Sequence, residues 1–576
     1  MRFDELTTYL EKLEEARGRA ILYGLLGELF NKATPAEVAA IAYLMEAQLA
    51  PAFAGVQIGM GERLVAAAIA QATGQPEAQV NKLYKKQGDL GLIAEALVPA
   101  KPQSRLTVAK VHEALLDIAR TSGAGSTEKK VEKLSGLVKA ATPGAARYLV
   151  RLAVGRLRLG VGVPTVIEAV ARTQADPRRA REIIERAYNL GSDLGLVLKT
   201  MRESGLDQLK RFKVRVGNPV RMMLAERLPD AAAIFKRLGR CAVEAKLDGL
   251  RCQVHWRGGK AEIFSRNLER LTDMFPDIAQ AVGAQVAART AIFEGEAMAF
   301  NEATGEFYPF QVTVQRKRKH KIAEKAETWP LALVVFDLLY ADGKDFTGKP
   351  YEQRRAALEA MIRSEGRIRP VERIVVTSAE QLQEFFDLQV GGGQEGVIAK
   401  RLNAPYQAGG RNYNWIKLKR TYGSELSDTV DGVIVGYLRG RGNRARLGVG
   451  ALLAAVYDAA TDTFKTIGKV GSGLSEENWI KLRKLLDKQA VAGRPARVDS
   501  RLVPDVWVEP QYLITILADE ITRSPVHTAA LDESGTGLAL RFPRVVGFIR
   551  EDKSPEDATT VEEIQKMYAM QKRQKK

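Results

Sequence analysis

Hydrophobic residues recur at intervals of three and four from residue 1 to about residue 215, which is the pattern of amphipathic helices. Two helix starts in this stretch are marked by a threonine followed by a proline, at residues 34–35 and 142–143. Threonine caps the free N–H groups of a first turn, and proline fits the first helical position. The pattern therefore predicts an all-α region over residues 1–215.

The pattern changes after residue 215 to short apolar or alternating strands mixed with helices, and from about residue 426 to strands separated by glycine-rich turns. A mixed pattern of this kind predicts an α+β domain over residues 216–425. The strands of residues 426–576 fit a small β-barrel, followed by a helix near residues 560–572. We therefore expect a multidomain chain whose three parts differ in fold class.

The composition argues against several classes of protein. Hydrophobic residues make up 45% and charged residues 27% of the 576 positions, as in ordinary packed domains. No apolar run reaches the roughly 20 residues of a membrane span, and the N-terminal segment lacks the apolar core of a signal peptide, so a cytoplasmic protein is expected. Two cysteines without CxxC spacing and four histidines predict neither a disulfide framework nor a zinc site. Any bound metal is expected to have oxygen ligands.

Positive charge is concentrated in one part of the helical region. The formal charge is +18, and residues 101–215 hold 23 Lys and Arg against 11 Asp and Glu, whereas residues 1–100 hold 9 against 12. A phosphate-binding face explains this excess, although an ordinary solvated surface would carry such charges as well. The basic stretch contains a glycine-serine loop at residues 121–127 and a predicted basic amphipathic helix after residue 143, which carries Arg147, Arg151, Arg156 and Arg158.

Lys246 is a candidate nucleophile. It lies in the segment EAKLDGLR at residues 244–251, where a predicted strand runs into an Asp-Gly turn and a second strand begins. A lysine attacks phosphorus as the free amine, and with a reference pKa of about 10.4 the neutral form costs about 4.6 kcal/mol at pH 7. Neighbouring cations lower this cost because they repel the ammonium form. The segment alone would arise by chance about as often as through function.

Further charged and aromatic residues follow this segment. Lys417 and Lys419 alternate with apolar residues, so both ammonium groups are expected on one face of a strand. Glu296 and Glu395 offer the hard oxygen ligands that Mg²⁺ prefers, or a bond to a ribose. Phe336, at the predicted end of an apolar strand, could stack on a base. Each residue alone also has an ordinary explanation, because strand-end lysines and glutamates are often solvated and a strand phenylalanine usually belongs to a core.

Taken together, these residues resemble the nucleotidyltransferase motifs of enzymes that form a covalent lysyl-nucleotide, in particular ATP-dependent DNA ligases of archaeal type. The resemblance extends over nearly the whole chain. It implies a helical DNA-binding domain at residues 1–215, an adenylation domain at 216–425, and an OB-fold barrel with a C-terminal helix at 426–576. It also implies a reaction in three steps, in which Lys246 takes AMP from ATP, the AMP moves to the 5′-phosphate of a nick, and the 3′-hydroxyl displaces it.

The resemblance implies roles for individual residues. Lys246 carries the AMP, and Glu296 and Glu395 hold the metal, which is Mg²⁺ with Mn²⁺ as a substitute. The other residues are expected to bind the nucleotide: Glu244 at the adenine amino group, Arg251 and Arg266 at the nucleotide or the nick phosphate, Glu296 also at the ribose, Phe336 on the adenine face, Lys417 and Lys419 at the α-phosphate, Arg411 within the same set, and Arg541 with Arg544 over the pyrophosphate.

Two other functions stay open on the sequence. An RNA ligase or a guanylyl-transferring capping enzyme shares the lysine and the barrel but rarely has a large helical domain in front, and a non-enzymatic DNA-binding protein leaves the Lys, Glu and Arg set unexplained. The expected partner is nicked double-stranded DNA, bound by a monomer associated with the nucleoid. Archaeal relatives dock on a sliding clamp through a glutamine followed by aromatics. The loop at residues 98–108 has a glutamine and no aromatic, so this docking is not expected.

Overall fold

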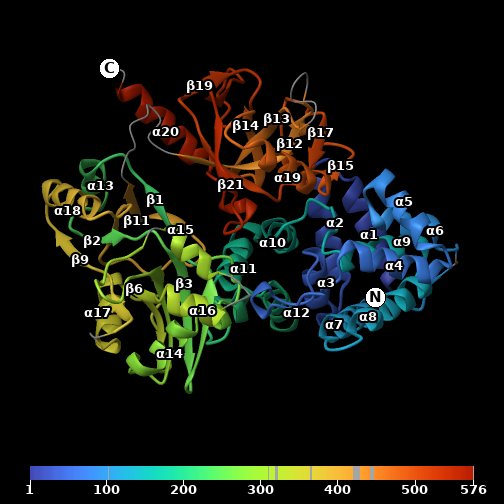
Figure 1. The fold of residues 1–576 in the computed structure, drawn as a ribbon, viewed down its shortest axis with the longest axis horizontal. Helices are drawn as coiled ribbons and strands as arrows, with labels where there is room; N and C mark the ends of the chain where they lie inside the picture. The colour runs from blue at the N-terminus through green and yellow to red at the C-terminus, as the bar shows by residue number, and fades with distance from the viewer. Residues whose placement is uncertain are drawn as a thin grey trace. The chain divides into compact units, whose positions relative to one another are not determined.

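In the computed structural model, the chain folds into two compact units (Figure 1). The first unit comprises residues 1–185, 194–210 and 423–576, and the second comprises residues 186–193 and 211–422. The boundary that the sequence predicts at residues 425 and 426 lies outside the described residues, and the division into three domains remains a prediction. The structure describes residues 1–100, 103–308, 310–317, 322–363, 366–419, 429–440 and 447–574.

The N-terminal part of the first unit is helical, as predicted. The helices are α1 (Phe3–Glu15), α2 (Arg19–Lys32), α3 (Pro35–Met45), α4 (Glu62–Thr73), α5 (Glu77–Gln87), α6 (Leu90–Leu97), α7 (Val108–Arg120), α8 (Ser126–Ala140), α9 (Pro143–Ala153), α10 (Val163–Ala171), α11 (Pro177–Gly191), whose end belongs to the second unit, and α12 (Leu194–Lys210). Both predicted helix starts are confirmed. Glu37 accepts a hydrogen bond from the Thr34 N–H at 3.0 Å, and Thr142 Oγ1 accepts one from the Ala145 N–H at 3.4 Å.

The basic helix after residue 143 is shorter than the sequence predicted. α9 ends at Ala153, and Gly155 adopts a φ of 74°, in the left-handed region that favours glycine. Arg156 and Arg158 therefore lie in the following loop, where Arg158 itself has a φ of 61°. The prediction of one helix carrying all four arginines is wrong.

The C-terminal part of the first unit is rich in strands, as predicted. Its elements are β12 (Val430–Leu438), β13 (Ala451–Asp458), β14 (Thr463–Val470), α19 (Glu476–Asp487), β15 (Ala490–Val491), β16 (Val498–Asp499), β17 (Val506–Val508), β18 (Leu513–Leu517), β19 (Glu520–Ser524), β20 (Gly537–Arg541), β21 (Arg544–Ile549) and α20 (Val561–Gln574). The main sheet has the order β15-β17-β12-β13-β14-β16, β18 pairs with β12 and β21, and β19 pairs with β20. Apolar residues of this sheet, α19 and α20 form its core.

The second unit has the mixed α+β composition that the sequence predicts. Its elements are β1 (Leu224–Arg227), α13 (Ala231–Leu238), β2 (Cys241–Lys246), β3 (Leu250–Arg257), β4 (Lys260–Ser265), α14 (Pro276–Gln285), β5 (Thr290–Ala299), α15 (Phe310–Thr313), α16 (Ile322–Thr328), β6 (Leu331–Ala341), β7 (Lys344–Asp345), α17 (Tyr351–Met361), β8 (Ile368–Pro370), β9 (Arg373–Val376), α18 (Ala379–Gly391), β10 (Gly396–Arg401) and β11 (Arg411–Lys419). One sheet has the order β1-β11-β10-β2-β9. The other has the order β4-β3-β5-β6-β7, with β8 beside β6.

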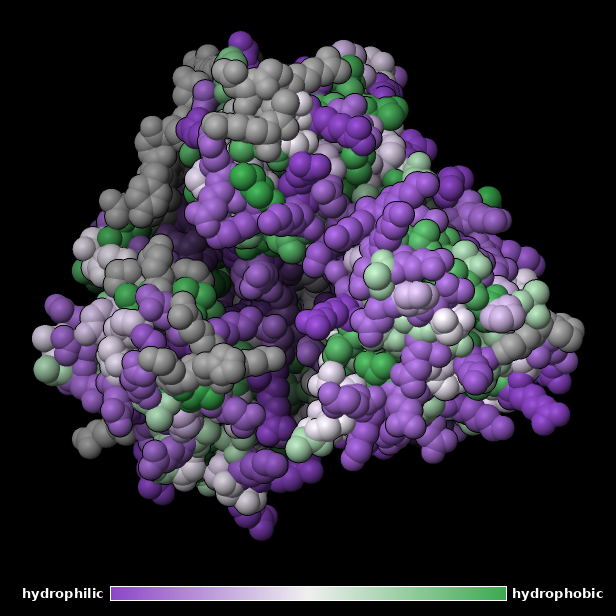
Figure 2. Space-filling model, turned by 45° about the vertical axis from the view of Figure 1, so that its right-hand side comes forward, coloured by the Kyte–Doolittle hydropathy of each residue, from purple (hydrophilic) through white to green (hydrophobic). Residues whose placement is uncertain are grey.

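Apolar side chains of the described residues lie mainly inside these units. The face drawn in Figure 2 is mostly hydrophilic, and hydrophobic residues occur there in small groups. Both cysteines are buried and free. No helix in the described part of the chain is both long enough and apolar enough to span a membrane.

Candidate active site

The first sheet of the second unit buries one face and carries charged residues on the other. Apolar residues of β2, β10 and β11 pack with α13 and α18 in a common core. Because successive residues of a strand point to opposite faces, the other face carries Glu244, Lys246, Lys417 and Lys419. The register places Lys246 and Lys419 opposite the same residue, Gly396. The predicted alternation along β11 is therefore confirmed.

Lys246 is the last residue of β2, at the strand end where the sequence predicts it. Its Nζ contacts Oε2 of Glu395, and the Nζ of Lys419 contacts Oε1 of the same carboxylate. Burial alone would raise the pKa of Glu395, but the charges of Lys246 and Lys419 outweigh it and lower the pKa to about 2. Burial and the charge of Lys246 lower the pKa of Lys419. Two ammonium groups thus share one ionised carboxylate.

Glu296 lies on β5 in the second sheet, opposite Arg251 of β3. Burial raises the pKa of Glu296 to about 7, and the negative charge of Glu395 also raises it. The positive charges of Lys246 and Arg251 lower the pKa but do not outweigh these two effects. The two glutamates are therefore close enough to repel each other, and their oxygens suit a hard cation. Within the described ranges, no group of three or more His, Cys, Asp and Glu side chains is placed to hold a metal. Other donors would have to complete a metal site at these two glutamates.

We expect Glu296→Gln to stabilise the nucleotide-free protein at neutral and alkaline pH. The folded-state pKa of about 7 lies above the ordinary value of 4.5, so ionised Glu296 destabilises the fold increasingly as the pH rises between these values. Glutamine removes this cost, which is on the order of 1–3 kcal/mol above pH 7. Melting curves of both proteins from about pH 5 to pH 8 should show a difference in Tm that grows with pH. A difference that does not change with pH would contradict the titration of Glu296 in this range.

Phe336 lies in the middle of β6, and the prediction that it ends a strand is wrong. The strand continues to Ala341 because its second half pairs with β5 and β7. The Phe336 ring is partly exposed between buried neighbours on β6 and makes an edge contact with Trp415 of β11, with centroids 6.2 Å apart. A partly exposed ring of this kind is suited to stacking on a planar ligand.

The guanidinium of Arg251 is held by protein groups. It donates to the Met223 carbonyl and to Glu294 Oε2, each at 2.8 Å, and it lies 5.4 Å from the centre of the Phe336 ring. Tyr406 donates its hydroxyl to the same Glu294 oxygen at 3.0 Å. Binding of a phosphate by Arg251 remains a prediction, and it would compete with these bonds.

Glu244 is buried on β2, and its carboxylate accepts hydrogen bonds from three side chains. Tyr351 donates its hydroxyl to Oε1, Arg355 approaches the same oxygen at 3.4 Å, and the ammonium of Lys400 lies 2.6 Å from Oε2. The sequence reasoning did not find these three donors. Alternation along β10 would have placed Lys400 on the face of the sheet that carries Lys246, but no local pattern marks Tyr351 or Arg355 on α17.

The remaining candidate residues are placed as follows. Arg266 comes directly after β4, Arg411 begins β11 opposite Leu224 of β1, and Lys417 lies opposite Ile398 of β10. The second unit therefore contains every residue of the predicted nucleotide set apart from the two arginines near the C-terminus.

Known proteins match the chain over almost its whole length. Three family models cover successive parts: "DNA ligase N terminus" at residues 2–171, "ATP dependent DNA ligase domain" at residues 222–419, and "ATP dependent DNA ligase C terminal region" at residues 445–553. A protein named "Probable DNA ligase" from Dictyoglomus thermophilum is 49% identical over 575 residues, which cover 100% of this chain and 99% of the relative. "DNA ligase 2" of Thermofilum pendens is 42% identical over 589 residues, covering 99% of this chain and 98% of the relative. The chain belongs to the ATP-dependent DNA ligases.

The ligase family forms phosphodiester bonds in DNA with the use of ATP, and it releases AMP and pyrophosphate. This identification is consistent with the cluster of Lys246, Lys419 and Glu395 at the end of β2. It also excludes the two alternatives that the sequence left open, an RNA-end transferase and a non-enzymatic DNA-binding protein.

The C-terminal arginines of the ligase lie in its first unit. Arg541 ends β20 and donates to Glu520 at 2.8 Å, while Arg544 begins β21 and donates to Asp519 at 3.1 Å. Both side chains are exposed, and Phe542 between them has a φ of 50°. Each arginine is thus presented at the surface by a strand end and held by one partly buried carboxylate.

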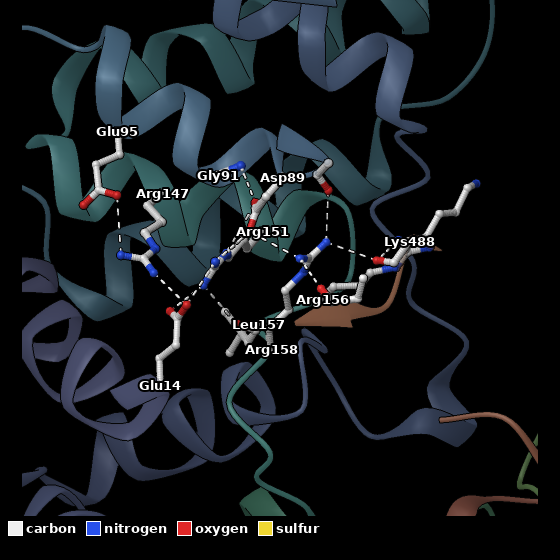
Figure 3. Close-up of polar contacts among 12 residues, drawn as sticks. Glu14, Asp89, Gly91, Glu95, Arg147, Arg151, Arg156, Leu157, Arg158 and Lys488 are labelled. Carbon is white, nitrogen blue, oxygen red and sulfur yellow. Dashed lines mark hydrogen bonds and ion pairs between the residues drawn. The ribbon is translucent and has the colours of Figure 1, made fainter. Parts of the chain in front are cut away.

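The four arginines that the sequence singled out in the ligase make contacts within the protein (Figure 3). Arg151 is buried and binds Glu14 and Asp89, each at 2.6 Å, and Arg147 also binds Glu14. Arg158 donates to the Lys488 carbonyl at 3.1 Å, and Arg156 to the same carbonyl at 3.4 Å. The guanidinium groups of these four arginines are therefore bound by groups of the protein itself.

Exposed cations of the same basic stretch lie elsewhere. Lys129, Lys133 and Lys139 are exposed on α8, whose first residue, Ser126, lies within the glycine-serine segment at residues 121–127. The basic run at residues 315–321, a pattern that is typical of a solvated loop, is described as far as residue 317. Within it, Arg316 is buried and bound to Asp277 at 2.9 Å.

Proposed function

We propose that Lys246 is the residue that the ligase charges with AMP. The observation that carries the proposal is the cluster at the end of β2, where Lys246 and Lys419 flank the carboxylate of Glu395. A lysine nucleophile needs cations nearby to favour its neutral form, and the α-phosphate needs donors beside the point of attack. Lys417 on the same sheet face supplies a further ammonium group for that phosphate.

In the first step, the free amine of Lys246 attacks the α-phosphorus of ATP, a P–N bond forms, and the bond to pyrophosphate breaks. The proton of the ammonium group leaves to solvent before the attack. Lys417 and Lys419 stabilise the charge that develops on the α-phosphate. The AMP then passes to the 5′-phosphate of a nick, and attack by the 3′-hydroxyl seals the nick and releases AMP.

The nucleotide is proposed to lie between the two sheets of the second unit. Burial, an aromatic face and fixed polar groups are the usual features of a base site. Phe336 supplies the aromatic face, and Glu244 supplies a fixed polar group. The other proposed nucleotide contacts are Glu296 at the ribose, Arg251, Arg266 and Arg411 at phosphate or sugar oxygens, and Arg541 and Arg544 at the leaving pyrophosphate.

Glu296 and Glu395 are proposed to hold Mg²⁺, with Mn²⁺ as a substitute. The fit rests on two carboxylates that lie close enough for Glu395 to raise the pKa of Glu296, together with the preference of Mg²⁺ for carboxylate, water and phosphate oxygens. The bound metal would neutralise phosphate charge during transfer. The role of these residues is to hold it beside the α-phosphate, and Glu395 keeps its negative charge at neutral pH because its pKa is about 2.

The helical region at residues 1–215 is proposed to bind nicked duplex DNA, and the strand-rich C-terminal part is proposed to be an OB-fold. The support for DNA binding is the excess of positive charge, now assigned to exposed lysines such as those of α8. We propose a monomer associated with the nucleoid. Docking on a sliding clamp through residues 98–108 is not proposed, and residues 101–102 of that loop lie outside the described residues.

Incubation with α-labelled ATP and Mg²⁺ tests this function. We expect a labelled protein band that pyrophosphate removes, and label that a nicked DNA duplex discharges but single-stranded RNA does not. Parallel reactions with ADP, GTP and NAD⁺ define the nucleotide. Absence of a labelled band with any nucleotide would rule out the lysyl-AMP mechanism for this chain.

We expect the double change Lys129→Ala and Lys139→Ala to weaken DNA binding and to flatten its salt dependence. For each DNA phosphate that the variant no longer neutralises, the slope of log K against log salt should fall by about 0.9, because fewer counterions are released. Lys82→Ala, an exposed lysine outside the basic stretch, is the matched control and should leave the slope unchanged. Binding titrations on nicked duplex at several salt concentrations check this. Equal slopes in all three proteins would show that α8 does not contact DNA.

A further inference from the structure

One buried ammonium group touches both residues that the proposed function assigns to the adenine base. Lys400 lies on β10 with its side chain 1% exposed. Its Nζ is 2.6 Å from Glu244 Oε2 and donates to the Phe336 carbonyl at 3.3 Å. It also lies 4.9 Å from the centre of the Phe336 ring and 4.2 Å from that of Trp415.

The bonds to Glu244 leave it able only to accept from a ligand. Its carboxylate has about four lone-pair positions. Tyr351 and Arg355 donate to Oε1, and Lys400 donates to Oε2. Three donors, two of them cationic, already point at the two carboxylate oxygens, so these oxygens serve as acceptors. One acceptor position therefore remains on Oε2, next to Lys400.

We propose that Lys400 is a positioning residue that makes the base site of the ligase select a purine with an amino group at position 6. An amino group donates a hydrogen bond to the remaining position on Glu244, whereas a carbonyl oxygen at position 6 would place one acceptor against another. Lys400 also fixes the backbone of Phe336, so the group that reads the base edge and the ring that stacks on the base share one support. This inference rests on the proposed roles of Glu244 and Phe336.

The buried pair of Lys400 and Glu244 explains why the support is specific. A buried charge without its partner is strongly unfavourable, so each of the two groups holds the other in place. Burial lowers the pKa of Lys400, and the negative charge of Glu244 raises it. This is the balance expected for a buried ammonium group that is stabilised by a neighbouring carboxylate. Methionine has similar length and no charge, so Lys400→Met removes the support while filling the space.

The test compares self-labelling by ATP with self-labelling by the triphosphate of purine riboside, which lacks the amino group. The wild-type ligase should prefer ATP by about 10- to 100-fold, the range expected for a hydrogen bond to a charged group. In Lys400→Met this preference should fall toward one, with most of the loss in the apparent KM for ATP. A residue with a merely structural role would slow both nucleotides equally and leave the ratio unchanged.

Lys325→Met is the matched control, because Lys325 also lies 4.2 Å from the centre of a tryptophan ring, that of Trp329, but on α16. Its ATP preference should equal that of the wild type. If Lys400→Met does not fold, Tyr351→Phe decides the question, since it removes one donor to Glu244 and keeps the ring; its ATP preference should fall by about threefold or more. An unchanged preference in the folded Lys400→Met protein, or in Tyr351→Phe, would overturn the proposal.

The outcomes also separate this inference from the proposed function. A wild-type ligase that labels equally well with both nucleotides would refute base selection by Glu244 and Lys400 while leaving charging at Lys246 intact. A wild-type ligase that labels with no nucleotide would refute the proposed function itself.

Discussion

Replacing Lys246 with alanine is expected to abolish labelling of the ligase by ATP, a loss of at least about 10⁴-fold. Lys246 ends β2, and the two neighbouring ammonium groups on this sheet face, those of Lys417 and Lys419, lie on β11. Neither can form the P–N bond at the same place, because β10 separates their strand from β2. Overall sealing should therefore be lost, whereas a nick that already carries 5′-AMP should still be sealed.

The matched measurement uses one preparation of the Lys246→Ala protein for both reactions. Labelling is followed with α-labelled ATP and Mg²⁺, sealing with a purified pre-adenylated nick, and folding with a melting curve. Continued labelling of the folded variant would exclude Lys246 as the nucleophile. Lys260→Ala, on β4 and exposed, should label at the wild-type rate.

Replacing Arg541 with alanine is expected to slow charging by ATP about 100-fold or more, with much less effect on sealing of a pre-adenylated nick. The guanidinium group is always charged and suits the oxygens of the leaving pyrophosphate, which takes part in the first step alone. The bond from Arg541 to Glu520 is exposed, so exchanging it for a phosphate costs little.

Single-turnover rates for the two reactions separate this role from a structural one. Arg523→Ala is the control, since Arg523 lies on the paired strand β19, is similarly exposed and binds Asp532 at 2.9 Å. It should not change either rate. If Arg541→Ala slows charging and sealing equally, or slows neither reaction, a role of Arg541 in pyrophosphate departure is contradicted.

The site residues whose positions follow from the alternation within a single strand were predictable from the sequence. Lys246 at a strand end, and Lys417 with Lys419 on one strand face, follow from the alternation of polar and apolar residues. Phe336 was misplaced because an apolar run does not show where its pairing partners end. Its strand extends to Ala341 through bonds to β5, which lies about 30 residues earlier in the chain, and to β7, which follows after a short turn.

Long-range pairing explains the other failures. The bond from Tyr351 to Glu244 spans 107 positions, and no spacing rule connects them. Similarly, counting charge located the basic stretch but could not show that Arg151 is neutralised by Glu14 and Asp89. A sequence gives the number of cations in a region, whereas their availability depends on which acidic side chains fold against them.

The central claim is that the ligase carries AMP on Lys246 and then transfers it to a nick. The most direct test isolates the labelled protein free of ATP, maps the AMP to its peptide by mass spectrometry, and then adds nicked duplex DNA with Mg²⁺. The account predicts AMP on the peptide containing Lys246 and the sealing of one nick for each AMP released, without added ATP. AMP on another lysine, or label that stays on the protein while nicks are sealed, would contradict it.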